Sequence, residues 1–382
     1  MDFKRECEQL LRQFGLPAVG LARIGPRGLE GLCCLGERRF GSGIAVTDRD
    51  LWHIGSCTKS MTATMIARLV ERGMFDWDIP IAPLFINGNA PVHPGFAHLT
   101  LRHLLTHRSG MPRDAQAASV DACFNSGHPI RAQRDLIARE AMLQGPMQPP
   151  GEAFCYSNLG YLVAGMVVEG LAGAAWEDLM RREVFSPLGL ASAGFGAPGG
   201  KPTSVLGGLL GGSILGGLMG QGNVTQPWGH QVCQGPEIYT DVPPFDPGTA
   251  DNKPLTGPAG TVHISLPDLC RYVAFHASRG ASVPGYLQPE TVDVLQTPLE
   301  GEEYAFGWGR ITAHVSGYYT PMISHEGSNG AWYTIIMIAP DLGRAWIMVA
   351  NAYPGAVQDQ QSGAWTTLAE LDDFWLCRAP SR

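Results

Sequence analysis

Lysine is scarce in this sequence. Only four lysines occur among 382 residues, and the formal net charge is −8. The chain has no basic run and no basic stripe, so it lacks the electrostatic pattern of a nucleic-acid-binding protein. We therefore expect no nucleic-acid partner.

The nine cysteines include no CxxC pair. Their odd number and scattered spacing argue against a zinc ribbon or a thioredoxin-type redox motif. The first 15 residues, MDFKRECEQLLRQFG, have the pattern of an amphipathic charged helix and lack the apolar segment of a signal peptide. We expect reduced thiols and a cytoplasmic protein.

Hydrophobic residues make up 45% of the chain, which suits a globular protein with a large core. Strand patterns occur at both ends of the chain: AVGLARIG and GLEGLCCLGERRFG near the start, and AWYTIIMIAP and RAWIMVANA, separated by DLG, near the end. Helical patterns fill the middle. We predict an α/β fold, with an antiparallel sheet flanked by helices and a mostly helical second domain.

The predicted sheet domain combines residues 1–75 and 240–382, and residues 76–239 form the predicted helical domain. Helices are expected after Ser56, over 99–112 with a stop at Gly110 and Pro112, and in RAQRDLIAREAMLQ. Further helices are expected over 156–173 and in WTTLAELDDFWLC near the end of the chain.

Residues 204–222, SVLGGLLGGSILGGLMGQG, have no charge, and glycine recurs every four residues. Such spacing occurs on the contact faces of membrane helices. Each glycine nevertheless disfavours a helix in water by about 1 kcal/mol relative to alanine. We favour a flexible apolar loop that acts as a lid over an active site; membrane or partner contact, or an insertion without a role, are the alternatives.

Ser56 and Lys59 form a Ser-x-x-Lys motif at the start of an apolar helix, and this motif occurs once in the chain. Three residues apart, the two side chains lie on one helix face. A serine hydroxyl is a poor nucleophile until a base takes its proton, and a lysine becomes that base only when its pKa is lowered. The helix N-terminus also favours the negative charge that develops on the serine oxygen.

Two later motifs add polar groups. CYSNLGY places Tyr156 and Asn158 at the start of another apolar helix, where Ser157 is a candidate cap. A phenol beside an ammonium group can ionise below its usual pKa and act as a general base. ISHEGSNG precedes a late strand, at a predicted edge of the sheet, where a backbone N–H could form half of an oxyanion hole and His325 would face the substrate.

Together, these motifs resemble the serine β-lactamase and penicillin-binding-protein superfamily. The order of Ser-x-x-Lys, Tyr-Ser-Asn and His-x-Gly is similar to its class C β-lactamase-like branch, which includes D,D-peptidases, and most of all to family VIII carboxylesterases. Supporting stretches are LRHLLTHRSGMP, PWGH, GPAGTVHISLPDLCRY and FGWG. The resemblance covers nearly the whole chain.

The resemblance implies a role for each motif residue. Ser56 is the acylated nucleophile, Lys59 takes or holds its proton, and Tyr156 is the general base in acylation and activates water in deacylation. Asn158 orients the substrate carbonyl side. The backbone N–H groups of Ser56 and Ser328 form the oxyanion hole.

One motif departs from the family pattern. His325-Glu326-Gly327 stands where β-lactamases and D,D-peptidases typically carry Lys-Thr-Gly or Lys-Ser-Gly, whose lysine binds a substrate carboxylate. We expect His325, Glu326 and Gly327 to contact the substrate, but a mostly neutral histidine should bind that carboxylate less well. An ester, lactone or thioester substrate is therefore favoured, and a small-molecule acyl substrate is the expected partner.

The function expected first is a carboxylesterase that works through an acyl-enzyme on Ser56. An acyltransferase with the same intermediate, a β-lactamase or D,D-peptidase-type amide hydrolase, and a non-catalytic binder of an acyl ligand are the alternatives.

PWGH contributes Trp228 and His230, which either line the substrate pocket or fix the glycine-rich segment to the body of the protein. His103 and His107 are spaced i, i+4, which suits zinc on a helix face, but no third ligand accompanies them. We expect no metal and no cofactor.

Overall fold

The structure is a computed structural model that describes residues 3–88, 90–199, 224–232, 239–244, 250–315 and 318–353. The glycine-rich segment 204–222 and the helix expected over 365–377 lie outside the described residues. In the described part, no single helix is both long and apolar enough to cross a membrane, and one bent pair, Asn158–Ala172 with Trp176–Phe185, passes that test by length and composition.

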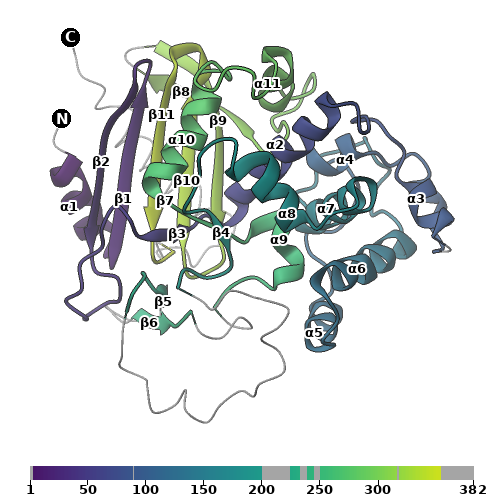
Figure 1. Ribbon diagram of the computed structural model, residues 1–382, viewed down its shortest axis with the longest axis horizontal. Helices are drawn as coiled ribbons and strands as arrows, with labels where there is room; N and C mark the ends of the chain where they lie inside the picture. The colour runs from purple at the N-terminus through teal and green to yellow at the C-terminus, as the bar shows by residue number, and fades with distance from the viewer. Residues whose placement is uncertain are drawn as a thin grey trace.

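A six-stranded antiparallel sheet joins the two ends of the chain (Figure 1). The strand order is β2-β1-β11-β10-β9-β8, and β1 pairs with β11 in the register Val19↔Ala350. The strands are β1 (Ala18–Gly25), β2 (Gly28–Gly36), β8 (Gly309–Val315), β9 (Tyr318–Ser328), β10 (Tyr333–Ala339) and β11 (Arg344–Ala350). The predicted fold class is confirmed.

The alternation of side chains along β1 shows how both faces of the sheet are covered. Val19 and Leu21 belong to the core under α1 (Phe3–Phe14), whereas Ala18 and Ala22 belong to the core shared with α10 (Leu266–Ala277). Successive residues of a strand point to opposite faces, so this strand is apolar on both. Figure 1 shows α1 and α10 on either side of the strands.

The helical region lies at the far side of the molecule from α1 (Figure 1). Its helices are α3 (Ala82–Asn87), α4 (Leu101–Leu105), α5 (Ala117–Asn125), α6 (Ile130–Gln144), α7 (Asn158–Ala172) and α8 (Trp176–Met180), which a π-helical turn, Arg181–Phe185, extends. The buried guanidinium of Arg134 on α6 contacts Glu169 of α7 and Glu177 of α8. This network ties three helices together.

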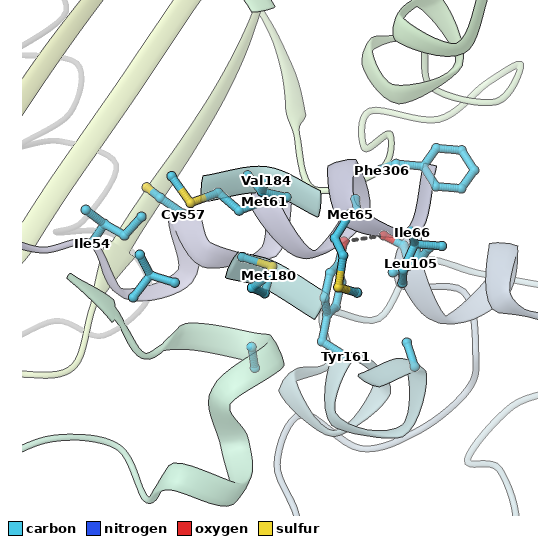
Figure 2. Packing of buried hydrophobic residues seen from close by; sticks show 14 of the residues in the cluster. Ile54, Cys57, Met61, Met65, Ile66, Leu105, Tyr161, Met180, Val184 and Phe306 are labelled. Atoms are coloured by element: carbon cyan, nitrogen blue, oxygen red, sulfur yellow. Dashed lines mark hydrogen bonds between the residues drawn. The ribbon is translucent and has the colours of Figure 1, made fainter. Parts of the chain in front are cut away.

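Helix α2 (Thr58–Glu71) runs between the sheet and the helical region. Figure 2 shows Met61, Met65 and Ile66 of α2 packed among residues from both regions. Eleven of its 14 residues are buried. Because α2 is enclosed on nearly all sides, the residues at its start hold a fixed position.

Short elements complete the fold around the start of α2. They include a three-stranded sheet, β3-β7-β4, whose strand β3 leads into the turn before α2, and a two-stranded ribbon, β5-β6. Their bounds, with those of the remaining helices, are β3 (Leu51–His53), β4 (Gly194–Phe195), β5 (Gly229–Val232), β6 (Tyr239–Val242), β7 (Val262–Ser265), α9 (Gly257–Gly260) and α11 (Pro289–Gln296); single 3-10 turns cover Gly55–Cys57, Pro94–Phe96, Pro254–Thr256 and Pro340–Leu342.

One prediction about these elements was wrong. The helix expected over 99–112 ends at Leu105, because His107 adopts a positive φ of 58° six residues after the helix begins at Leu101 and well before Gly110. Strand β9 is the second strand of the sheet, but its pairing with β8 ends at Ser324, so His325–Ser328 pair with β10 alone, as expected for a local edge. The domain boundaries at 75/76 and 239/240 stay a prediction.

Candidate active site

Ser56 lies at a sharp turn between a strand and a buried helix. β3 ends at His53, Gly55 adopts a φ of +49°, and the 3-10 turn Gly55–Cys57 then leads directly into α2. Gly55 supplies this left-handed backbone without the penalty of a Cβ. Ser56 is partly exposed, while its neighbours Gly55 and Cys57 are buried. The turn therefore leaves the Ser56 side chain partly accessible between two buried residues.

Lys59 is fully buried, and three oxygens surround its amine. Nζ lies 2.7 Å from Oδ1 of Asn158, 2.7 Å from the carbonyl oxygen of Ala259 and 3.1 Å from Oγ of Ser56. The first two oxygens only accept hydrogen bonds, so they take two N–H groups. Only the Ser56 hydroxyl can donate, and the lone pair of a neutral amine would therefore face that hydroxyl.

The electrostatics favour that neutral form. Burial, and after it the positive charge of Arg113, lowers the pKa of Lys59 to about 7. A lysine without a buried carboxylate partner loses its proton readily, since desolvation disfavours the charged amine. A large fraction of Lys59 is thus available as a base near neutral pH.

Tyr156 and Asn158 reach the same site from the start of α7. Ser157 caps this helix, because its Oγ accepts a hydrogen bond from the Gly160 N–H at 2.8 Å. The Tyr156 ring centroid lies 4.9 Å from Nζ of Lys59. The Asn158 amide bridges Lys59 and Asp114, since its Nδ2 donates to Oδ1 of Asp114 at 2.7 Å. Both sequence interpretations of this motif, a helix cap and a site contribution, are thus compatible.

Burial raises the pKa of the Tyr156 phenol above its ordinary value. A side-chain hydrogen bond with Ser56 and the charge of Arg113 act in the opposite direction, but burial prevails. The phenol is therefore protonated at neutral pH, and it can hand a proton on and recover one without ionising fully.

Strand β9 passes so close to Ser56 that side chains are excluded between them. A Cβ on Gly327 would lie 1.9 Å from the Ile54 carbonyl oxygen and 2.8 Å from the Ser56 nitrogen, and one on Gly55 would lie 2.3 Å from the Ser328 nitrogen. Glycine at both positions brings the backbone nitrogens of Ser56 and Ser328 to one location. Two such N–H groups are the usual components of an oxyanion hole.

His325 lies beneath the site surface. Its ring is buried: Nδ1 lies 2.5 Å from the Glu326 carbonyl oxygen, and Nε2 lies 3.0 Å from the Tyr304 hydroxyl. A carbonyl only accepts, so Nδ1 carries the proton and Tyr304 donates to Nε2. Burial, and after it the charge of Lys59, lowers the pKa of His325 to about 3. The expectation that a free ring faces the substrate needs correction: both ring nitrogens are occupied.

Two further predicted contacts are corrected by the structure. The Glu326 carboxylate accepts a hydrogen bond from Tyr333, which belongs to the core under α1, on the sheet face opposite to that of His325. His230 is buried, with Nδ1 2.8 Å from the Asn351 carbonyl and Nε2 accepting from the Phe40 N–H at 3.1 Å. Both residues therefore have structural contacts in place of the predicted substrate contacts.

Trp228 is buried as well. Its backbone N–H donates to the Arg38 carbonyl, and the Arg39 guanidinium lies 5.2 Å from its ring centroid. Together with His230, it fixes β5 to the loop after β2; whether the pair also fixes the glycine-rich segment stays a prediction, because that segment lies outside the described residues.

The two histidines of LRHLLTH serve the backbone. His103 Nδ1 accepts a hydrogen bond from the Thr100 N–H in a capping box, and His107 Nδ1 accepts one from the Ser157 N–H at 3.0 Å. The His107 ring also packs 4.3 Å from the Tyr156 ring, centroid to centroid. It thereby positions Tyr156, a role that the i, i+4 spacing does not indicate. Among the described residues, no group of three or more His, Cys, Asp or Glu is placed to hold a metal ion.

Sequence reasoning missed one contact pair near the nucleophile. His53 accepts a hydrogen bond from the Gly55 N–H at Nδ1, and its Nε2 lies 2.8 Å from Oδ1 of Asp251. The same Asp251 oxygen accepts from Nδ2 of Asn329, next to Ser328. Asp251 thus links both sides of the turn at Ser56. No sequence motif marks residues about 200 positions apart as neighbours.

The fold and the serine–lysine pair define a serine hydrolase, of the class that typically works through an acyl-enzyme. A model of the family Beta-lactamase matches residues 35–369. The chain belongs to this β-lactamase family, which includes penicillin-binding protein homologues.

Two relatives align with most of the chain. It is 26% identical over 375 residues to penicillin-binding protein 4 of Amycolatopsis lactamdurans, covering 91% of this chain and 84% of the relative. It is 25% identical over 369 residues to the unguisins hydrolase ungD' of Aspergillus campestris, covering 92% of this chain but 61% of that longer protein.

Solved structures show the same fold. The octameric penicillin-binding protein homologue from Pyrococcus abyssi superposes with a TM-score of 0.69 at 21% identity, over 93% of this chain and 74% of the other. The D-amino acid amidase from Ochrobactrum anthropi, complexed with D-phenylalanine, superposes with a TM-score of 0.65 at 20% identity, over 91% and 89%.

Proposed function

We propose that this protein is a carboxylesterase that hydrolyses small or medium esters through an acyl-enzyme on Ser56. The observation that carries the proposal is the environment of Lys59. Two acceptor oxygens take its N–H groups, and the lone pair of the neutral amine faces the Ser56 hydroxyl, which lies 3.1 Å away. A buried amine in that arrangement is suited to take the serine proton.

The geometry supports a stepwise reaction. The Lys59 amine takes the hydroxyl proton as Oγ of Ser56 attacks the ester carbonyl, and the N–H groups of Ser56 and Ser328 stabilise the negative oxygen. The C–O bond to the alcohol then breaks. Lys59 returns the proton to the leaving alcohol through the Tyr156 phenol, which gives up one proton and receives another. Water then attacks the acyl group by the same proton route, which releases the acid and restores Ser56.

Preference for an ester follows from the His325 position. The neutral, buried ring has both nitrogens engaged, so it offers no positive charge to a substrate carboxylate. Penicillins and peptidoglycan peptides bear such a carboxylate, and a site without the lysine charge binds it less strongly. Asn158 remains available beside the nucleophile to orient the acyl group.

Amide hydrolysis is the second candidate. The names of two similar proteins, a penicillin-binding protein and a D-amino acid amidase, favour it. The chemistry of the first half-reaction is the same, because Lys59 and Tyr156 would deliver a proton to an amine in place of an alcohol. Acyl transfer to an acceptor other than water differs only in the second half-reaction. A non-catalytic binder would not need the complete set of Ser56, Lys59 and Tyr156.

A paired turnover assay tests the proposal. Purified protein and its Ser56→Ala variant receive short-chain p-nitrophenyl esters, a chromogenic cephalosporin and an amino acid p-nitroanilide in parallel. We expect ester hydrolysis that the variant loses, with little turnover of the other two. Dominant cephalosporin or anilide turnover would replace the esterase by an amide hydrolase, and equal turnover by both proteins would remove Ser56 from the mechanism.

A further inference from the structure

A cavity of about 310 Å³ adjoins the candidate site through Asn158. It lies between α5, the first turns of α7 and the segment 251–256. The Asn158 amide that reaches the cavity also accepts a hydrogen bond from Lys59 and is therefore one residue away from the reacting serine. A group attached to the acyl carbon of a substrate at Ser56 can extend into this space.

The wall of the cavity is acidic. Asp114, Asp121 and Asp251 line it, and Lys253 is the one cationic residue among the described lining residues. Lys253 lies 3.5 Å from Asp121, and Nδ2 of Asn158 donates to Asp114. Arg113 lies 3.6 Å from Asp114, so two cations face three carboxylates and one negative charge remains in excess.

The two oxygens of the Asp251 carboxylate differ in their contacts. Its side chain is only 4% exposed, and its Oδ1 is surrounded by donors from Asn252 and Asn329 and by the His53 ring. Its Oδ2 is buried and has no hydrogen-bond partner among the described residues. A buried carboxylate oxygen without a donor is costly, so a donor supplied by a ligand would be stabilised there.

The lining also has an apolar part, which includes Leu159 and Leu162 of α7 and Val120 of α5. We propose that the preferred acyl group carries a protonated amine on a short alkyl chain. The chain would lie against these apolar side chains, and the ammonium would bind among Asp251, Asp121 and Asp114. This inference rests on the proposed function, because it assigns the acyl part of the substrate that acylates Ser56.

The test compares two esters of matched shape. The p-nitrophenyl esters of β-alanine and of butanoic acid differ by an ammonium group in place of a terminal methyl group. Each rate is divided by the uncatalysed rate of the same ester at pH 7, which removes the difference in intrinsic reactivity. We expect the kcat/KM ratio to favour the β-alanyl ester by about ten- to a hundredfold, the range for a hydrogen bond to a charged group.

Two variants and one control locate the effect. Asp121→Asn should lower this ratio by about tenfold, mainly through the β-alanyl ester. Asp251→Asn should lower the ratio as well, but it should also slow both esters, because Asp251 links both sides of the turn at Ser56. Asp135→Asn removes a carboxylate that pairs with Arg139 on α6 and does not line the cavity, so the ratio should not change. Asp121 is 59% exposed and its variant should fold normally, even if Asp251→Asn does not.

The possible outcomes separate the two proposals. Equal turnover of the two esters, lost in Ser56→Ala, would overturn the ammonium inference and leave the esterase intact. A preference that survives in Asp121→Asn and in folded Asp251→Asn would also overturn it. Absence of Ser56-dependent turnover with both esters would remove the proposed function and this inference together.

Discussion

At the scale of single residues, the account depends on which group takes the proton from Ser56. Lys59 and Tyr156 both lie in the site, but burial lowers the pKa of the lysine and raises the pKa of the tyrosine. The pKa of Lys59 falls to about 7, which makes its basic form common at neutral pH. The pKa of Tyr156 rises, which makes its basic form rare. These directions support the proposed roles of Lys59 as the base and Tyr156 as a proton relay.

This assignment predicts the pH dependence of kcat/KM. The lysine is active in its deprotonated form, so kcat/KM should rise with pH and level off above an inflection near 7. A pH–rate profile of ester hydrolysis, measured at substrate concentrations well below KM so that most of the enzyme is free, reports this pKa. A rise that continues past about pH 9 without levelling would assign the base to the tyrosine phenolate.

Two substitutions check the same point independently. Lys59→Arg keeps the positive charge but cannot give up a proton, so it should lose most activity while the protein stays folded by circular dichroism. Tyr156→Phe should slow acylation by about two to four orders of magnitude, the scale of general acid–base catalysis. Near-normal turnover by Lys59→Arg would contradict the assignment.

At the scale of elements, the site is an intersection of three segments: the turn before α2, the start of α7 and strand β9. The contact between the turn and β9 is the closest, because Gly55 and Gly327 leave no room for a Cβ on either side. The spacing of the two oxyanion N–H groups is thus set by the packing of backbone against backbone.

Gly327→Ala should disturb this packing. Its Cβ would meet the Ile54 carbonyl oxygen at 1.9 Å, so the backbone of β9 must move away from Ser56. Loss of one oxyanion-hole donor costs about 10²- to 10³-fold in kcat, and we expect a loss of this size in steady-state assays. Unchanged kcat would show that Ser328 is not an oxyanion-hole residue.

Gly170→Ala provides the matched control. Gly170 is exposed within α7 and nothing lies within 4 Å of its Cβ position. Kinetics should not change, and the free energy of unfolding measured with denaturant should rise by up to about 1 kcal/mol, the difference in helix propensity.

The elements themselves could mostly be predicted from sequence, because local periodicity determines them. The two terminal hairpins and the helices that begin at Thr58 and Asn158 are confirmed. The helix predicted over 99–112 was wrong because tertiary contacts of His107 hold a positive φ that the local sequence does not signal.

The candidate site residues also divide into those that a local motif predicts and those that depend on tertiary contacts. Ser56, Lys59, Tyr156 and Asn158 lie in sequence motifs, and the structure brings them together, while their catalytic roles stay a prediction. The placement of Glu326 depends on which face of β9 it occupies, and the role of Asp251 depends on contacts across the chain. Such information comes from tertiary packing, which one sequence does not contain.

At the scale of the whole molecule, the sheet is assembled from both chain ends, and the helical region is held to it around α2. Arg134 is a fully buried charge of the helical region that contacts Glu169 and Glu177 and donates to the Leu255 carbonyl. Its removal leaves buried Glu169 without its charged partner.

Arg134→Ala should therefore lower the free energy of unfolding by about 3–5 kcal/mol, the cost of removing one partner of a buried ion pair. Arg139→Ala is the control, because its pair with Asp135 is more than a third exposed on both sides. That change should cost less than about 1 kcal/mol. Equal losses in denaturant titrations would contradict the structural role of Arg134.

The central claim is that Ser56 carries the acyl group, and an adduct measurement tests it most directly. The protein is mixed with an excess of p-nitrophenyl ester, quenched in acid within the first turnover, digested and analysed by mass spectrometry. The account predicts one added acyl group on the peptide containing Ser56, assigned to that residue by fragmentation and absent in Ser56→Ala. Acylation of another residue, or hydrolysis without any adduct at early times in wild type and Lys59→Arg alike, would contradict it.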